Sequence, residues 1–181
     1  MKQFGCRATF GIEVGDAVDT SSHFLLDFYL RGIHLNWADN RGYLGSVAHY
    51  FPIRSVEQEH LVTPKDSFDM LLGGSISVTL AALLGDNDLY QKYSRLDLGP
   101  VTDSFSLVVL PNATGVVLIG IRNDGWGGDD PNLPNWNETI MPDGELVHWL
   151  SVALAADEYL KVVDGARHAI LDLRERSASQ R

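Results

Sequence analysis

The stretch FSLVVLPNATGVVLIGIR, residues 105–122, decides the fold. Two runs rich in Val, Leu and Ile are separated by a connector that contains Pro, Asn and Gly, which is the pattern of a β-hairpin. Both arms are apolar on both faces, so we expect neither face of the hairpin to be exposed to water. The pattern therefore predicts two paired strands, 105–110 and 116–122, at the centre of a sheet.

Further strands are predicted on both sides of this hairpin. Within residues 23–31, apolar residues alternate with polar ones such as Asp27, which indicates a half-buried antiparallel strand. Gly32 marks a bulge or a turn, and the Asn, Asp and Gly residues of 38–42 are typical of a turn. The remaining strands are expected over residues 7–14, 33–37, 43–51 and 145–154, with loops over 15–22 and 123–142.

Helices are predicted in the middle of the chain and at its end. Thr63 is a good N-cap, Pro64 suits a first helical position and Asp66 complements the helix dipole, so we expect a helix that runs to about Leu72. Residues 75–84 and 86–93 are expected to form two more helices. Apolar residues at spacings of three and four predict an amphipathic helix over 157–176.

The composition is that of an ordinary globular protein. The chain has 181 residues, of which 45% are hydrophobic and 21% charged, so it can bury a core without disulfides or metal. We expect one α+β domain over residues 1–181, in which an antiparallel sheet has inserted helices and a C-terminal amphipathic helix packs on the sheet. Cys6 is the single cysteine, and the sequence starts without the apolar segment of a signal peptide. These features favour a cytoplasmic protein without a membrane partner.

The acidic charge is concentrated in one segment. The formal net charge is −10, and residues 123–160 hold eight acidic residues and no Lys or Arg, whereas residues 161–181 hold five basic and three acidic residues. Binding to nucleic acid requires charge of the opposite sign, so we expect no nucleic-acid partner. The simplest alternative is that the acidic surface only keeps the protein soluble.

The acidic segment begins with the sequence RNDGWGGDDPNLPNWNET, residues 122–139, which combines carboxylates with two tryptophans. Tryptophan is enriched at the centres of protein interfaces, and carboxylates around it would attract a basic protein. An alternative is that both tryptophans fold back onto the sheet and cap the core. The candidate partner-binding residues are Asp124, Trp126, Asp129, Asp130, Trp136 and Glu138.

Motifs for catalysis or metal binding are missing from the sequence. Gly115 and Gly120 have the spacing of a phosphate-binding loop, but the lysine that would follow is absent. The acidic residues of 122–139 could bind calcium, although the ligand order of an EF-hand is missing. Glu57 and Glu59 beside His60 are best explained as a solvated loop. We therefore predict no catalytic residue, no metal site and no cofactor.

The start of the chain carries a family resemblance. Phe4-Gly5 and Phe10-Gly11-Ile12-Glu13, followed by a Phe-rich strand and a Gly-containing turn, resemble the small bacterial immunity proteins of polymorphic toxin systems. The resemblance also includes the closing helix. It implies a protein that binds and neutralises a cognate toxin domain, often a basic nuclease, and it supplies no site residue because the toxin-facing residues of such proteins are diverse.

Two other functions stay open at this stage. The segment 122–139 could form the pocket of a small-molecule-binding or hydrolytic enzyme domain, which predicts a deep cleft with converging polar groups. The chain could also be a structural subunit of a larger assembly, which predicts a broad apolar patch and self-association.

Overall fold

The strands form two antiparallel sheets in this computed structural model, which describes residues 1–18, 22–37, 40–62, 75–96, 98–112, 115–123 and 135–179. The first sheet has the order β1-β2-β3-β4, with β5 also paired to β3, and the second has the order β6-β7-β9-β8. The strands are β1 (Lys2–Gly5), β2 (Phe10–Ala17), β3 (His23–Leu30), β4 (Ile33–His34), β5 (Arg41–Tyr43), β6 (Phe105–Asn112), β7 (Gly115–Arg122), β8 (Asn137–Ile140) and β9 (Leu146–Leu154).

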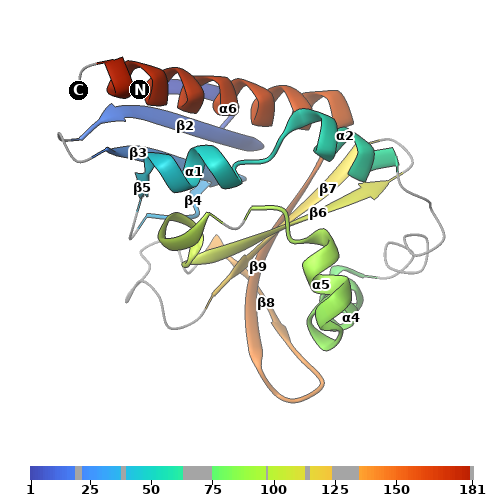
Figure 1. Ribbon diagram of the computed structural model, residues 1–181. Helices are drawn as coiled ribbons and strands as arrows, with labels where there is room; N and C mark the ends of the chain where they lie inside the picture. The colour runs from blue at the N-terminus through green and yellow to red at the C-terminus, as the bar shows by residue number, and fades with distance from the viewer. Residues whose placement is uncertain are drawn as a thin grey trace.

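The helices cover the two sheets from different sides (Figure 1). The long C-terminal helix α6 packs against β1 and β2 of the first sheet, and α1 packs beside it. Helices α4 and α5 lie against the second sheet. The helices are α1 (Leu44–Tyr50), α2 (Arg54–Val62), α4 (Ile76–Gly85), α5 (Asn87–Tyr93) and α6 (Ala156–Ser179), with the short 3-10 helix η2 (Gly99–Thr102) before β6. This arrangement confirms the α+β class, with a C-terminal helix packed on a sheet.

The hairpin β6–β7 is buried on both faces, as its sequence predicts. Leu107 and Leu118 point into the larger core, which lies between the two sheets, α6 and α1. Val108 and Ile119 point into a smaller core under α4 and α5. Aromatic contact joins the two sheets, because the ring centroids of Phe28 in β3 and Phe105 in β6 lie 5.5 Å apart.

The predicted strand over 43–51 is wrong, because Leu44–Tyr50 forms helix α1. Leu44, Val47 and Ala48 are the buried residues of this helix, and their spacing of three and four is helical rather than alternating. A second correction concerns Glu57, which lies on helix α2 and is buried instead of belonging to a solvated loop.

Several predicted boundaries also shift. The strand expected over 7–14 is β2 and begins at Phe10, because Cys6 and Thr9 form a turn after the additional strand β1. The loop expected over 123–142 contains strand β8, and β6 lies at an edge of its sheet rather than at the centre. The helix predicted over Thr63–Leu72 lies outside the described residues, as do positions 38–39 of the predicted turn.

Polar side chains cap the N-termini of helices α4 and α5, which the sequence predicts over 75–84 and 86–93. The Ser75 side chain accepts a hydrogen bond from the backbone N–H of Val78 at the start of α4. Asp86 does the same for Leu89 at the start of α5, where the distance is 3.0 Å. A Ser or Asp side chain at the N-cap satisfies a backbone N–H that the helix itself leaves unpaired.

Gly115, at the start of β7, provides a test of this packing. A Cβ atom at this position would overlap the carbonyl oxygen of Leu154 in β9, so Gly115→Ala forces the two strands apart. We expect a loss of about 1–3 kcal/mol in the free energy of unfolding, measured by urea denaturation. Gly85→Ala is the matched control, because nothing lies within 4 Å of its Cβ position in α4 and alanine favours a helix. An equal loss in both variants would contradict this account.

Candidate functional site

The strands β8 and β9 form a hairpin that extends away from α6 and the first sheet (Figure 1). The turn of this hairpin has the sequence Met141-Pro142-Asp143-Gly144-Glu145, whose Pro, Asp and Gly are typical turn residues. Gly144 adopts a φ of 91°, which favours glycine, and its N–H donates to the Met141 carbonyl oxygen at 2.9 Å. The Asp143 carboxylate accepts a hydrogen bond from the N–H of Glu145 at 3.0 Å, as Asp commonly does in turns. These contacts hold the two strands in register.

One face of the hairpin packs against helix α4. Thr139 in β8 is opposite Val147 in β9, and both belong to this face. The Thr139 hydroxyl lies 3.1 Å from the Ser77 hydroxyl of α4 and accepts a hydrogen bond from Trp149 Nε1 at 2.9 Å. Val147 is buried in the smaller core. This face therefore attaches the hairpin to the rest of the protein.

The opposite face of the hairpin carries exposed apolar and acidic side chains. Ile140 pairs with Leu146 across the two strands, and they are 74% and 41% exposed. Glu138 pairs with His148, and the Glu138 side chain is 62% exposed, with its carboxylate 3.4 Å from His148 Nε2. Asp143 and Glu145 at the turn are also exposed. We call the five residues Glu138, Ile140, Asp143, Glu145 and Leu146 the hairpin surface.

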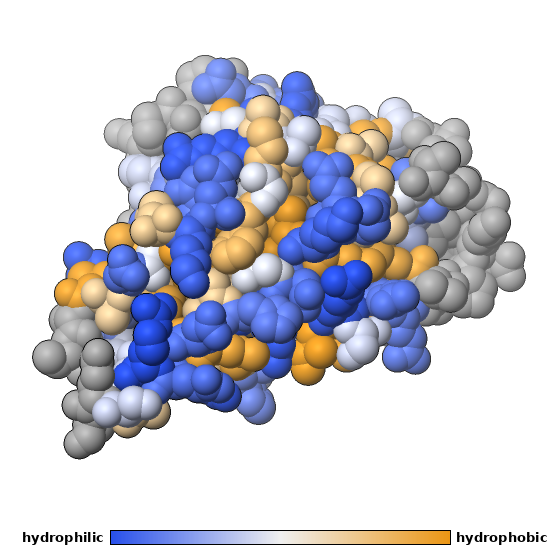
Figure 2. Space-filling view, turned by 90° about the horizontal axis from the view of Figure 1, so that it is seen from above, coloured by the Kyte–Doolittle hydropathy of each residue, from blue (hydrophilic) through white to orange (hydrophobic). Residues whose placement is uncertain are grey.

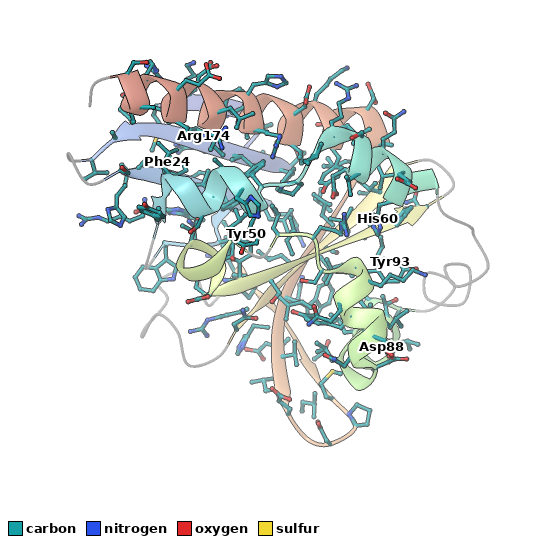
Figure 3. All side chains as sticks on the ribbon, in the orientation of Figure 1. Phe24, Tyr50, His60, Asp88, Tyr93 and Arg174 are labelled. Carbon is teal, nitrogen blue, oxygen red and sulfur yellow. The ribbon has the colours of Figure 1, made fainter. Side chains whose placement is uncertain are left out.

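Apart from His148 beside Glu138, the segment that carries the hairpin surface has no basic side chain. Residues 135–155, all of them described, contain no Lys or Arg. Helices α4 and α5, which lie on the other side of the hairpin, carry the exposed Asp86 and Asp88, and Asp88 lies at the outer end of the helix pair (Figure 3). The face over α6 also mixes hydrophilic and apolar side chains (Figure 2).

Two of the six residues predicted to bind a partner, Trp136 and Glu138, lie in the described part of the chain. Trp136 is 7% exposed and belongs to the larger core, so it caps the core, as the alternative interpretation proposed, and it is not an exposed contact residue. Glu138 is exposed, in keeping with its predicted place on an acidic surface. Four of the predicted residues, namely Asp124, Trp126, Asp129 and Asp130, lie outside the described residues.

Sequence reasoning missed the apolar part of the hairpin surface. Ile140 and Leu146 meet only because residues 137–140 form a strand, and that segment was expected to be a loop. The signal that could have found it is the turn sequence Pro142-Asp143-Gly144, which directly precedes the correctly predicted strand β9.

A buried ionic network lies between the second sheet and the helices. Glu57 of α2 is 1% exposed, and its carboxylate accepts hydrogen bonds from Arg95 Nη2 at 2.6 Å and from the Tyr159 hydroxyl of α6 at 2.7 Å. Burial, followed by the Glu57 charge, raises the pKa of Tyr159 well above its usual value, so Tyr159 stays a proton donor. His60 lies beside Tyr93, and its Nε2 donates to the Val109 carbonyl oxygen at 3.1 Å (Figure 3). Each of these groups has a partner that joins two elements.

A second polar network lies on the outer face of the first sheet. Glu13 and Asp27 are directly opposite each other on β2 and β3, and both are 3% exposed. Two like charges in this arrangement repel, so each needs its own partner. Arg7 binds both oxygens of Glu13, and Asn40 donates to Asp27 at 2.7 Å.

His34 completes this second network. Its Nε2 lies 2.7 Å from an Asp27 oxygen, a close contact whose angle is not that of a hydrogen bond. Burial alone would raise the pKa of Asp27, but the contacts with His34 and Asn40 outweigh it, and the pKa lies below the usual value. The network therefore favours the charged form of Asp27, and it pairs the Glu13 carboxylate opposite with Arg7.

The geometry of the described residues provides no assembled metal centre. Within this part of the chain, no group of three or more His, Cys, Asp or Glu side chains could hold a metal ion. No helix among the described residues is long and apolar enough to cross a membrane. Comparisons with protein-family models, with curated protein sequences and with solved structures returned no match for this chain.

Removal of one hydrogen bond tests the buried network. Tyr159→Phe leaves one oxygen of the Glu57 carboxylate without its buried donor, so we expect the free energy of unfolding to fall by about 1.5–3 kcal/mol. Tyr50→Phe is the matched control, because Tyr50 is 65% exposed, and we expect a change within about 0.5 kcal/mol. Equal urea midpoints and slopes for Tyr159→Phe and the wild type would contradict a stabilising role.

The pH dependence of stability tests the burial of His60. Burial lowers the pKa of His60 below its usual value of about 6.5. Below that pH the unfolded chain binds a proton that the folded chain does not yet bind, so stability falls as the pH decreases through this window. We expect His60→Gln to reduce the loss of stability between about pH 7 and pH 5, measured by urea denaturation. The same substitution at His168, which is exposed, should leave the loss unchanged.

Proposed function

We propose that this chain is a cytoplasmic immunity-type protein that binds and neutralises a basic toxin domain, and that the hairpin surface is part of its binding site. The observation that carries this proposal is the combination of exposed Ile140 and Leu146 with exposed carboxylates in a segment without Lys or Arg. The resemblance of the N-terminal strands to immunity proteins supports the same function.

The two kinds of side chain contribute to binding in different ways. The carboxylates of Glu138, Asp143 and Glu145 attract a basic protein over several ångströms and raise the rate of encounter. The apolar side chains of Ile140 and Leu146 lose water on contact, which slows dissociation. A standard interface buries roughly 1,600 Å² in total, so neighbouring surface must also contribute.

The alternative of a small-molecule pocket concerns 122–139, of which residues 124–134 lie outside the described part of the chain, and a hollow that the described residues form elsewhere is shallow. This hollow of 370 Å³ between β1 and the start of α6 is open to solvent and lined mainly by exposed side chains. The buried titratable groups Glu57 and Tyr159 are fully engaged with each other and with Arg95. These groups stabilise the fold, and they do not converge on a cleft that could hold a substrate.

Charge reversal on the hairpin surface tests the proposed function. The probe is a candidate toxin domain encoded by a gene adjacent to that of this chain, and the variant is Glu138→Lys combined with Glu145→Lys. We expect association to slow by about tenfold or more at low ionic strength, with a smaller difference at high salt and little change in the dissociation rate. Surface plasmon resonance at several salt concentrations measures both rates.

The matched control changes the same total charge elsewhere. Asp172→Lys combined with Glu175→Lys alters two exposed carboxylates of α6, far along the chain from the hairpin. We expect this variant to associate like the wild type, and both the wild type and this variant to restore growth to cells that express the toxin domain. Failure of the wild-type chain to bind the domain or to restore growth would overturn the proposed function.

A further inference from the structure

The two edges of the second sheet differ in whether their backbone groups are occupied. At the β6 edge, Ser94 bridges to Val108, and the N–H of Arg95 donates to the Leu107 carbonyl oxygen at 3.0 Å. The His60 side chain occupies the next carbonyl oxygen on this edge, that of Val109. This edge therefore cannot accept another strand without the loss of existing hydrogen bonds.

Strand β8 forms the other edge, and its outward groups can be assigned from the turn. The N–H of Met141 donates to the Glu145 carbonyl oxygen at 2.8 Å, so Met141 faces β9. Because N–H groups alternate in direction along a strand, Thr139 also faces β9, whereas Ile140 and Glu138 direct their N–H and C=O groups outward. Among the described residues, no backbone hydrogen bond outside the strand pairs involves Glu138 or Ile140.

We propose that the basic partner of this chain adds an extended strand to the edge of β8. This inference rests on the proposed function and specifies how the partner binds. The outward groups of Glu138 and Ile140 offer two donors and two acceptors to such a strand, and peptide strands commonly bind to open sheet edges in this way.

The side chains of β8 define which strand fits the edge. Glu138 and Ile140 are two residues apart and therefore share one face of the hairpin, the face that also carries Leu146. On an added strand, the residue opposite Glu138 would be Lys or Arg and the residue opposite Ile140 would be apolar. The recognised segment therefore has a cation and an apolar residue separated by one position.

The acidic charge argues against a second copy of this chain as the occupant. Two β8 edges paired side by side would place both Glu138 carboxylates on one short stretch of sheet, in a segment without Lys or Arg. Like charges close to paired strands are destabilising, and charged residues at sheet edges prevent self-association in natural proteins. The same charges favour a basic strand.

A synthetic peptide with two repeats of Lys-Thr-Val-Thr is the probe for this edge. Its Lys and Val side chains fall on one face of an extended strand, and a peptide with Glu in place of Lys is the matched control. Because an isolated peptide loses conformational entropy on binding, we expect a Kd on the order of 1 mM. In NMR hydrogen exchange, the Glu138 and Ile140 amides should exchange at least about tenfold more slowly with saturating peptide. The Thr139 amide, which already faces β9, should change little.

A backbone substitution separates strand addition from side-chain contact. Ile140→Pro removes the outward N–H, and proline is tolerated at edge positions whose N–H points away from the sheet. Ile140→Ala removes most of the same side chain but keeps the N–H. We expect the proline variant to bind the toxin domain at least about tenfold more weakly than the alanine variant.

The outcomes distinguish the binding mode from the proposed function. Strand addition is overturned if the Lys peptide does not bind at about 5 mM or binds without slowing exchange at Glu138 and Ile140. It is also overturned if folded Ile140→Pro and Ile140→Ala bind the toxin domain equally. If the proline variant does not fold, the hydrogen-exchange data on the wild type alone show whether a strand is added. If the wild type still binds the toxin domain with charge-dependent rates, the proposed function stands without strand addition. If no toxin domain binds at all, both proposals fail.

Discussion

The hairpin β6–β7 imposes the main constraint on this structure, because it is apolar on both faces and both faces must be covered. Leu107 and Leu118 face the first sheet and α6, whereas Val108 and Ile119 face α4 and α5. Each covering layer is attached by polar contacts as well as by apolar area. Glu57 binds Arg95 and the α6 residue Tyr159, so the buried network connects the helices to the sheet that they cover.

The same constraint explains why the β8–β9 hairpin has an exposed face. The covering layers are matched to β6 and β7, and the outer part of β8 and β9 extends past them (Figure 1). On this face of the hairpin, Trp136 is still buried in the larger core, whereas Ile140, four residues later, is 74% exposed. Exposed apolar side chains such as Ile140 and Leu146 do not stabilise the core of the isolated chain. Core packing therefore does not explain why these two positions are apolar, as it does for the buried residues.

The sequence predicts the elements whose signals are local and redundant. The 105–122 hairpin, the alternation of β3 and the apolar stripe of α6 each combine a period with a boundary signal. The strand prediction for 43–51 failed because α1 has only seven residues, too few for the helical spacing of its three buried residues to be recognised. The burial of Trp136 and Glu57 depends on residues far away in the chain, which no local pattern contains. The exposed pair Ile140 and Leu146 depends in turn on a strand of four residues, too short for its period to be recognised.

The acidic character of the β8 edge has a physical reason that is independent of solubility. An open edge strand with exposed apolar side chains would pair with any extended chain, including another copy of itself. Proline or a bulge would block all such pairing, but charged side chains block it selectively, and carboxylates repel acidic strands and attract basic ones. Glu138 lies between the buried part of the hairpin and the exposed Ile140, where its charge acts on any strand that approaches the outward backbone groups. Under the proposed strand addition, the carboxylates and the outward backbone groups of Glu138 and Ile140 would select a basic strand, whereas described residues of the chain itself occupy the opposite edge, at β6.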